Sequence, residues 1–199
     1  MSTSLDSLVG ELQIIAGARQ STTPATQVVT APRRSARGRA ADTLYVLVEL
    51  GGAASGVLGD MIQRMRDAYW ATPGSVTAAL RTAINVGGEW LMDRNVNAPV
   101  PDRQNGGVSC AVLRGNEVVI AQAGPASAYV AQHGTVQHYP APDADPVTPL
   151  GVARANEVRF ARVDLQPGDL IVLTDSRWAA RVPIEAVASA TVSVSVAQA

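Results

Sequence analysis

Leu165-Gln-Pro-Gly-Asp-Leu-Ile-Val-Leu-Thr-Asp-Ser-Arg-Trp178 is the stretch of sequence that decides the fold. Its proline and glycine are typical of a tight turn, because proline presets φ and glycine is free to take a positive φ. The apolar run from Leu170 to Leu173 is too short for a helix, so we expect a core strand that is covered on both faces. The strand ends in a carboxylate, Asp175. The stretch therefore predicts a buried strand that brings an acid to the edge of a sheet.

The segments on either side of this stretch predict a single α+β domain that spans residues 1–199, with residues 1–10 frayed. Apolar residues at helical spacing indicate helices over 55–70 and 75–94 and a short helical segment over 183–189. Four segments between 108 and 139 are separated by tight turns, which is typical of an antiparallel meander. Further strands are expected at 12–17, 26–31, 44–50, 157–163 and, from the Val-Ser alternation, 191–196.

Composition excludes several classes of function. The net charge of −1 gives no general attraction to nucleic acid or to an anionic membrane. The chain contains no Lys, which excludes an ordinary P-loop, and its one cysteine, Cys110, excludes an internal disulfide. We expect Cys110 to be a buried small apolar residue. No apolar run of about 18 residues and no apolar leader is present, so we expect a cytoplasmic protein.

In chain order, the segments resemble the motifs of the metal-dependent (PPM, type 2C) Ser/Thr protein phosphatases. Gly168 to Trp178 is similar to the family's Gly-Asp, four apolar residues, Ser/Thr-Asp-Gly-Leu-Trp, with Ser176-Arg177 in place of Gly-Leu. The other similar segments are Gly17-Ala18-Arg19, Tyr45 to Gly52, Gly107 to Val112, Val119 to Tyr129 and Pro149-Leu150-Gly151. The resemblance covers most of the chain.

The resemblance implies an αββα sandwich, in which two antiparallel sheets are flanked by helices. It also implies a site at the sheet ends, where carboxylates of the family hold two Mg²⁺ or Mn²⁺ ions that activate a water against a phosphoserine or phosphothreonine. Such ions need several oxygen ligands that converge, so a single carboxylate cannot hold them. By the same resemblance, Arg19 is the residue that would contact the phosphate.

The chain departs from the family at three of four ligand positions. Asp175 keeps its carboxylate, whereas the other positions align with Pro24, Val48 and Ala188. Glu49 lies one residue from the aligned position, and a shift of one residue along a strand turns a side chain to the opposite face. We therefore expect Glu49 to face away from the ligand position.

These departures favour a catalytically inactive domain, a pseudophosphatase, that acts as a binding or regulatory module in the cytoplasm of a bacterium and takes no cofactor. The alternative is a divergent but active phosphatase in which Asp175, Glu49 and loop acids such as Asp42 hold Mg²⁺ or Mn²⁺. In that alternative, Arg19 binds the phosphate through its guanidinium.

A third hypothesis concerns the basic loop of residues 32–39, which contains Arg33, Arg34, Arg37 and Arg39. Such a loop is typical of a solvated surface, but it could also contact an acidic or phosphorylated protein. The expected partner is therefore a protein, and neither nucleic acid nor a membrane.

Overall fold

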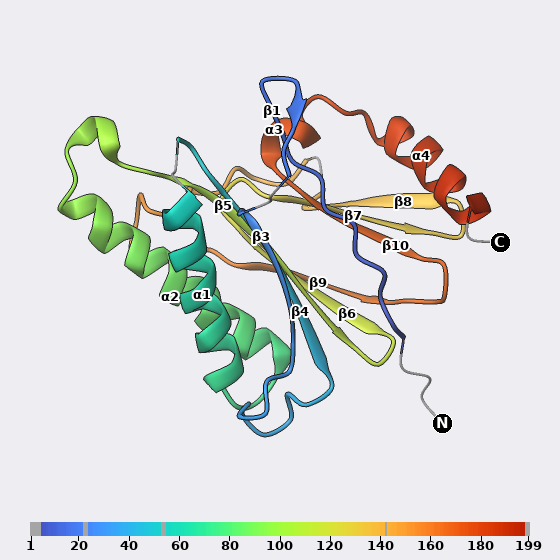
Figure 1. Ribbon diagram of the computed structural model, residues 1–199, viewed down its shortest axis with the longest axis horizontal. Helices are drawn as coiled ribbons and strands as arrows, with labels where there is room; N and C mark the ends of the chain where they lie inside the picture. Colours follow the sequence, from blue (N-terminus) through green and yellow to red (C-terminus); the bar gives the residue numbers. More distant parts are fainter. Residues whose placement is uncertain (1–4, 22–23, 53–54, 142, 198–199) are drawn as a thin grey trace.

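The computed structural model describes residues 5–21, 24–52, 55–141 and 143–197. Two antiparallel sheets pack face to face, and two long helices cover the outer face of the larger sheet (Figure 1). The larger sheet has the order β3 (Thr26–Thr30), β4 (Asp42–Leu50), β5 (Gly106–Arg114), β6 (Glu117–Ala123) and β9 (Arg159–Asp164). The smaller sheet has the order β10 (Leu170–Thr174), β7 (Ser127–Gln132) and β8 (Thr135–Tyr139). The expected αββα sandwich is confirmed.

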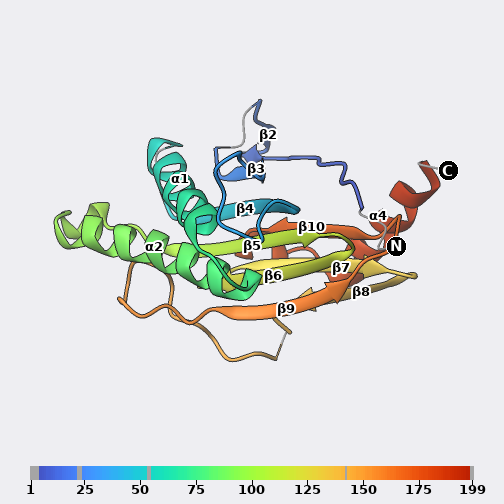
Figure 2. The ribbon, with the colours of Figure 1, turned by 90° about the horizontal axis from the view of Figure 1, so that it is seen from below.

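The two long helices form where the apolar spacing predicts them. Helix α1 spans Ser55–Ala71 and helix α2 spans Val76–Val96. Ser75 caps α2, since its side chain accepts a hydrogen bond from the Ala78 N–H at 3.1 Å. The apolar faces of α1 and α2 pack on one face of the larger sheet. Together they form a core that includes Met61, Leu80 and Ile84. Figure 2 shows both helices on the same side of this sheet.

A second core fills the space between the two sheets. Ala111 and Ile120 of the larger sheet meet Ala128 and Val130 of the smaller one. Strand β4 contributes to both cores, because successive side chains of a strand point to opposite faces. Its buried residues Leu44, Val46 and Val48 face the helices, whereas Tyr45 packs in the core between the sheets.

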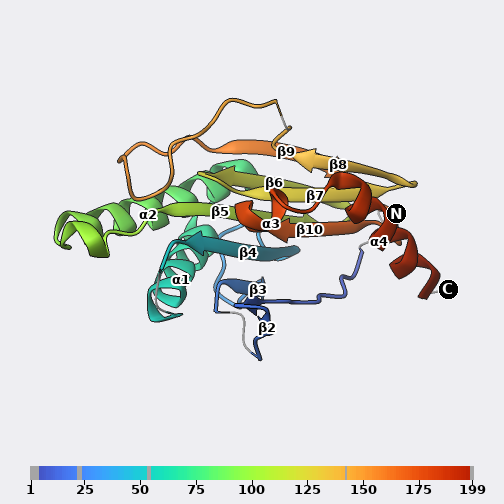
Figure 3. The ribbon, with the colours of Figure 1, turned by 90° about the horizontal axis from the view of Figure 1, so that it is seen from above.

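The order of the strands corrects two expectations. The segments from 108 to 139 do not form one meander, because the chain passes from β6 to the other sheet through residues 124–126. Strand β10 is not covered on both faces either. It lies at the edge of its sheet, and all its residues except Thr174 are only partly buried. The C-terminal helix α4 (Ile184–Ala197) packs against β8 and crosses the end of the smaller sheet (Figure 3).

The two ends of the chain also differ from expectation. Residues 191–196 belong to helix α4, so the predicted edge strand is wrong. The expected strand over 12–17 is reduced to a hairpin of β1 (Ile14–Ile15) and β2 (Ala18–Arg19). Leu5 is not frayed, since its N–H donates to the Gly115 carbonyl at 3.0 Å and its side chain packs against the core between the sheets. Residues 1–4 lie outside the described part of the chain.

None of the helices in the described part of the chain has the length and apolar character of a membrane span.

Candidate functional site

The ends of β4 and β10 meet at one edge of the sandwich. Glu49 of β4 accepts two hydrogen bonds from Ser176, one from the backbone N–H at 2.8 Å and one from the hydroxyl at 2.9 Å. The Arg177 guanidinium lies 3.8 Å from the same carboxylate, whose side chain is 16% exposed. Because Ser176 directly follows Asp175, the structure brings Glu49 beside the strand end that carries the retained acid.

Asp175 uses its carboxylate to start a helix. Its Oδ1 accepts the Trp178 N–H at 2.6 Å and so caps the short helix α3 (Ser176–Ala179). The residue is exposed. The two acids at this edge are therefore both engaged by N–H or O–H donors of α3.

The structure places Glu49, rather than Val48, on the side of the smaller sheet. Val48 is 1% exposed and belongs to the core between the helices and the sheet. Our expectation that Glu49 faces away from the site is therefore corrected. Pro24 directly precedes Ala25, whose carbonyl accepts the Val48 N–H at 2.8 Å, so it lies beside the end of β4. Ala188 lies in helix α4.

Asp42 lies at the opposite end of β4 from Glu49, seven residues or about 23 Å away along the strand. Its buried carboxylate accepts the Arg114 Nε–H at 2.6 Å and the Tyr69 hydroxyl at 2.6 Å. Burial, with the hydrogen bond to Asp42 next, raises the pKa of Tyr69 far above its ordinary value. Asp42 is thus a structural acid, and the idea that it joins Glu49 and Asp175 as a ligand is wrong.

Arg39 lies in surroundings different from those expected of a surface loop, whereas Arg19 lies on the surface. Arg39 is fully buried, lies 3.4 Å from the Asp42 carboxylate and donates to the Thr72, Gly74 and Ser75 carbonyls. It is therefore not available to a partner. Arg19 is exposed in β2, and no contact among the described residues joins it to Glu49 or Asp175. Its role with a phosphate stays a prediction.

Sequence reasoning missed a polar chain inside the sandwich at this edge. The Gln122 amide donates to the Tyr139 carbonyl at 2.9 Å and to the Ser109 hydroxyl at 3.3 Å. Ser109 in turn donates to the Ser127 carbonyl at 3.3 Å, so these bonds link the two sheets. The signal was present in the sequence, because Ser109 and Gln122 occupy inward positions of otherwise apolar strands.

The outer face of the smaller sheet carries an aromatic stack. The Tyr129 ring lies 4.5 Å from the His138 ring, nearly parallel to it, and 5.8 Å from the Trp178 ring. Burial lowers the pKa of His138 and raises that of Tyr129. His138 is half-buried.

Cys110 offers no nucleophile to the site. The side chain is 1% exposed, and burial raises the pKa of its thiol to about 12. A thiol becomes a strong nucleophile only as the thiolate, so burial keeps this one inert. The expectation of a buried small apolar residue is confirmed.

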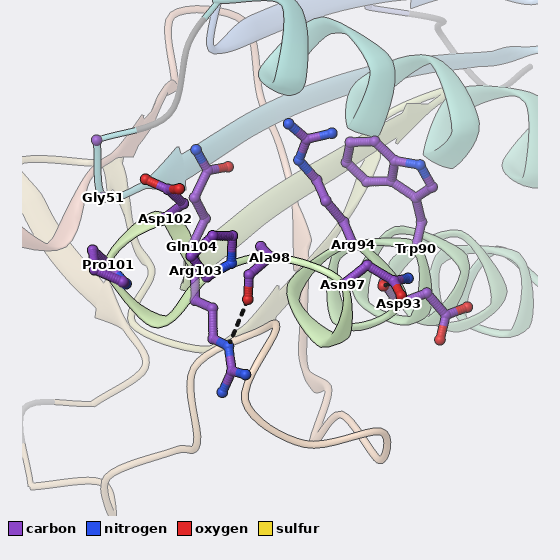
Figure 4. Close-up of a pocket in the computed structure, with 12 residues that line it drawn as sticks. Gly51, Trp90, Asp93, Arg94, Asn97, Ala98, Pro101, Asp102, Arg103 and Gln104 are labelled. Carbon is purple, nitrogen blue, oxygen red and sulfur yellow. Dashed lines mark hydrogen bonds between the residues drawn. The ribbon is translucent and has the colours of Figure 1, made fainter.

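A cavity of about 820 Å³ opens next to this edge, between the C-terminal end of α2 and Gly51-Gly52 (Figure 4). Trp90, Arg94, Arg103 and Gln104 contribute to its wall, and Arg103 also donates to the Ala98 carbonyl at 3.4 Å. Its lining mixes acids, arginines and amides, so its charge singles out no ligand.

No family model matches the chain, and no curated protein matches it in sequence. Solved structures match its fold. The S. agalactiae serine/threonine phosphatase is 13% identical with a TM-score of 0.61, and the match covers 90% of this chain and 84% of that one. PppA, a key regulatory component of T6SS in Pseudomonas aeruginosa, is 19% identical with a TM-score of 0.51 and coverages of 87% and 84%.

The catalytic domain of the serine/threonine phosphatase PstP, in complex with two manganese ions, is 14% identical with a TM-score of 0.54. The match covers 86% of this chain and 90% of that domain. Together these likenesses show that the chain has the fold of the PPM-type Ser/Thr phosphatases, as the motifs predicted.

The PstP complex corrects our expectation of a chain without a cofactor, because a protein with this fold holds two manganese ions. The residues of this edge nevertheless do not fit a two-metal centre of that kind. In the part of the chain that the structure describes, no three His, Cys, Asp or Glu side chains gather closely enough to hold a metal ion. We therefore derive no catalytic step through a metal.

Proposed function

We propose that this chain is a catalytically inactive PPM-type phosphatase domain that acts as a binding or regulatory module. The observation that carries the proposal is the contact between Glu49 and Ser176, at 2.8 and 2.9 Å. A carboxylate that already accepts an N–H and a hydroxyl has fewer lone pairs left for the hard cation on which the phosphatase reaction depends. Asp175 is engaged in the same way, since its Oδ1 caps α3.

One further observation supports an inactive domain, and another supports a regulatory role. Proline and alanine stand at two of the positions where the resemblance expects carboxylates, Pro24 and Ala188, and neither side chain can bind a cation. Among the solved structures of the same fold, PppA is described as a regulatory component. A regulatory part is what we propose for this chain as well.

An assay of phosphate release tests the proposal. The purified full chain is incubated with Mn²⁺ and either p-nitrophenyl phosphate or a phosphoserine peptide, with the S. agalactiae phosphatase as positive control. We expect no release above the protein-free blank, while circular dichroism shows that the sample is folded. Release that disappears in Asp175→Asn but persists in Asp60→Asn, which changes an exposed acid of α1, would contradict the proposal.

The second candidate is a divergent, active phosphatase, and one observation favours it. Glu49 at the end of β4 and Asp175 at the end of β10 lie at the same edge of the sandwich. Both lie on the side of the larger sheet that faces the smaller one. If the chain is active, Glu49→Gln should lower the rate of phosphate release as strongly as Asp175→Asn does. Asp42→Asn should act only through stability, because Asp42 lies at the other end of β4.

A further inference from the structure

We infer that Arg33, Arg34 and Arg37 form a docking site for an acidic segment of a protein partner, an inference that rests on the proposed function as a binding module. We call these three residues the arginine triad. All three side chains are exposed, and among the described residues none of them forms an ion pair with an acid. The triad thus places three unpaired cations within five residues.

Some exposed arginines elsewhere in the described chain lie close to acids. Arg154 lies 3.2 Å from Asp93, and Arg162 lies 3.2 Å from Glu117. The triad differs from the other arginines in density, because nowhere else in the sequence do five consecutive residues contain three arginines.

The loop that carries the triad is fixed to the body of the protein. The Ala36 N–H donates to the Trp70 carbonyl at 2.7 Å, at the end of α1. The Arg114 guanidinium donates to the Gly38 carbonyl at 2.8 Å, and the buried Arg39 donates to the Ser75 carbonyl at 2.7 Å. The guanidinium groups are thus presented from an ordered backbone, which lowers the entropy that is lost when a ligand binds.

The triad lies away from the edge where Glu49 meets Ser176. The loop connects β3 to β4 and precedes Asp42, whereas Glu49 lies near the other end of β4. In Figure 1 the blue loop is at the bottom of the molecule and α3 is near the top. A segment bound to the triad would therefore leave the phosphatase-like edge uncovered.

The chemistry of the triad selects carboxylate or phosphate groups carried by a peptide. A planar guanidinium binds either group through two parallel hydrogen bonds. Nucleic acid is a poorer fit, because loop residues 31–41 contain no aromatic side chain on which a base could stack. The negative net charge also opposes the general attraction to phosphate backbones that nucleic-acid-binding proteins use.

Fluorescence anisotropy with the full chain tests the site. The probes are a labelled peptide rich in Glu and a matched peptide in which phosphoserine replaces part of the Glu, each titrated at low and at physiological salt. We expect binding that weakens as salt is added, because exposed charges are screened over about 10 Å at 0.1 M salt. Arg33→Gln, Arg34→Gln and Arg37→Gln combined should weaken it at least about tenfold. The tighter peptide identifies whether the anion is a carboxylate or a phosphate.

The matched control removes the same charge elsewhere, by Arg103→Gln, Arg154→Gln and Arg181→Gln, all exposed residues. This variant should bind within about twofold of the wild type if the site is local. No binding of either peptide at low salt, an equal loss in both triple variants, or tighter binding of a single-stranded oligonucleotide would each overturn the inference. Phosphate release is measured on the same samples. Release of phosphate would contradict the proposed inactive domain, whereas the inference about the triad depends on the peptide titration alone.

Discussion

Asp42 supplies the carboxylate that pairs with two arginines, Arg39 and Arg114, at the start of β4. It is 2% exposed and lies within hydrogen-bond distance of Arg39, Arg114 and Tyr69. Arg39 is buried as well, and its ring neighbour Tyr69 lies 4.9 Å from the guanidinium. A buried cation without its carboxylate is strongly unfavourable, because the protein interior solvates charge poorly.

Asp42→Asn is therefore expected to lower the free energy of unfolding by about 3 kcal/mol or more. Tyr69→Phe keeps the charges of Asp42, Arg39 and Arg114 and removes one hydrogen bond, so it should lower the free energy of unfolding by only about 1 to 1.5 kcal/mol. Urea denaturation at pH 7 measures both values. Asp60→Asn, on the exposed face of α1, serves as the control and should stay within about 0.5 kcal/mol of the wild type. Equal stabilities of all three variants would show that the buried network does not stabilise the fold.

The residues of the candidate edge could be predicted from the sequence only in part. Asp175 was found because it follows an apolar strand in an uninterrupted motif. Glu49 was predicted to face away from the site, because it lies one residue from the position that the resemblance aligns with a metal ligand. The alternation of Leu44, Val46 and Val48 already placed Val48 with the apolar face, so periodicity was a better guide than the motif.

At the scale of elements, the passage between the two sheets depends on glycines. A Cβ on Gly107 would lie 1.9 Å from the Pro125 carbonyl oxygen, and one on Gly124 would lie 2.3 Å from the Gly106 carbonyl oxygen. Gly124 also has a φ of 65°, which side chains rarely adopt. The start of β5 and the connection from β6 to β7 therefore approach more closely than any other residue would allow.

Gly107→Ala should lower the free energy of unfolding by at least about 3 kcal/mol, because the atoms that it meets belong to the backbone and cannot rotate away. Gly59→Ala is the matched control in the exposed face of α1, where nothing lies within 4 Å of the added Cβ. This control should gain about 0.5 to 1 kcal/mol from its higher helix propensity. Thermal melts followed by far-ultraviolet circular dichroism compare the two. A Gly107→Ala variant as stable as the wild type would mean that the start of β5 and the connection from β6 to β7 can move apart without a loss of stability.

The two long helices with strong apolar periodicity could be predicted from the sequence, whereas the elements at the two ends of the chain could not. Helices α1 and α2 follow from apolar spacing, and Ser75 marks the start of α2. Residues 191–196 alternate Val and Ser with the period of a strand, yet they continue helix α4. Strand propensity is dominated by packing against neighbours, so a segment that no strand pairs with can continue a preceding helix instead.

At the scale of the whole molecule, β4 joins the two cores, since its side chains enter both. The polar chain from Gln122 through Ser109 to the Ser127 carbonyl and the contact between Glu49 and Ser176 tie the sheets together at one edge. Neither sheet can be exposed without disrupting a core that the other one shares. The single domain expected from the length of the chain should therefore unfold as one unit.

This cooperativity can be measured with the tryptophans as local reporters. Trp70 of α1 and Trp90 of α2 pack in the core between the helices and the larger sheet, whereas Trp178 lies against the smaller sheet. Trp178→Phe therefore leaves reporters on the helix side alone. We expect tryptophan fluorescence of the wild type and of Trp178→Phe, together with far-ultraviolet circular dichroism, to give the same midpoint in urea for each protein. A fluorescence transition of Trp178→Phe that precedes the circular dichroism transition would instead indicate that the helix side unfolds separately.

The position of β10 at the end of its sheet has a practical consequence for all of these measurements. One side of the strand pairs with β7, and among the described residues no strand pairs with the other side of its apolar sequence, Leu170 to Leu173. An open strand edge of this kind is a template on which a strand of another molecule can pair. Refolding from denaturant is therefore best carried out at low protein concentration, and the reversibility of each melt should be checked at two concentrations before a free energy is derived from it.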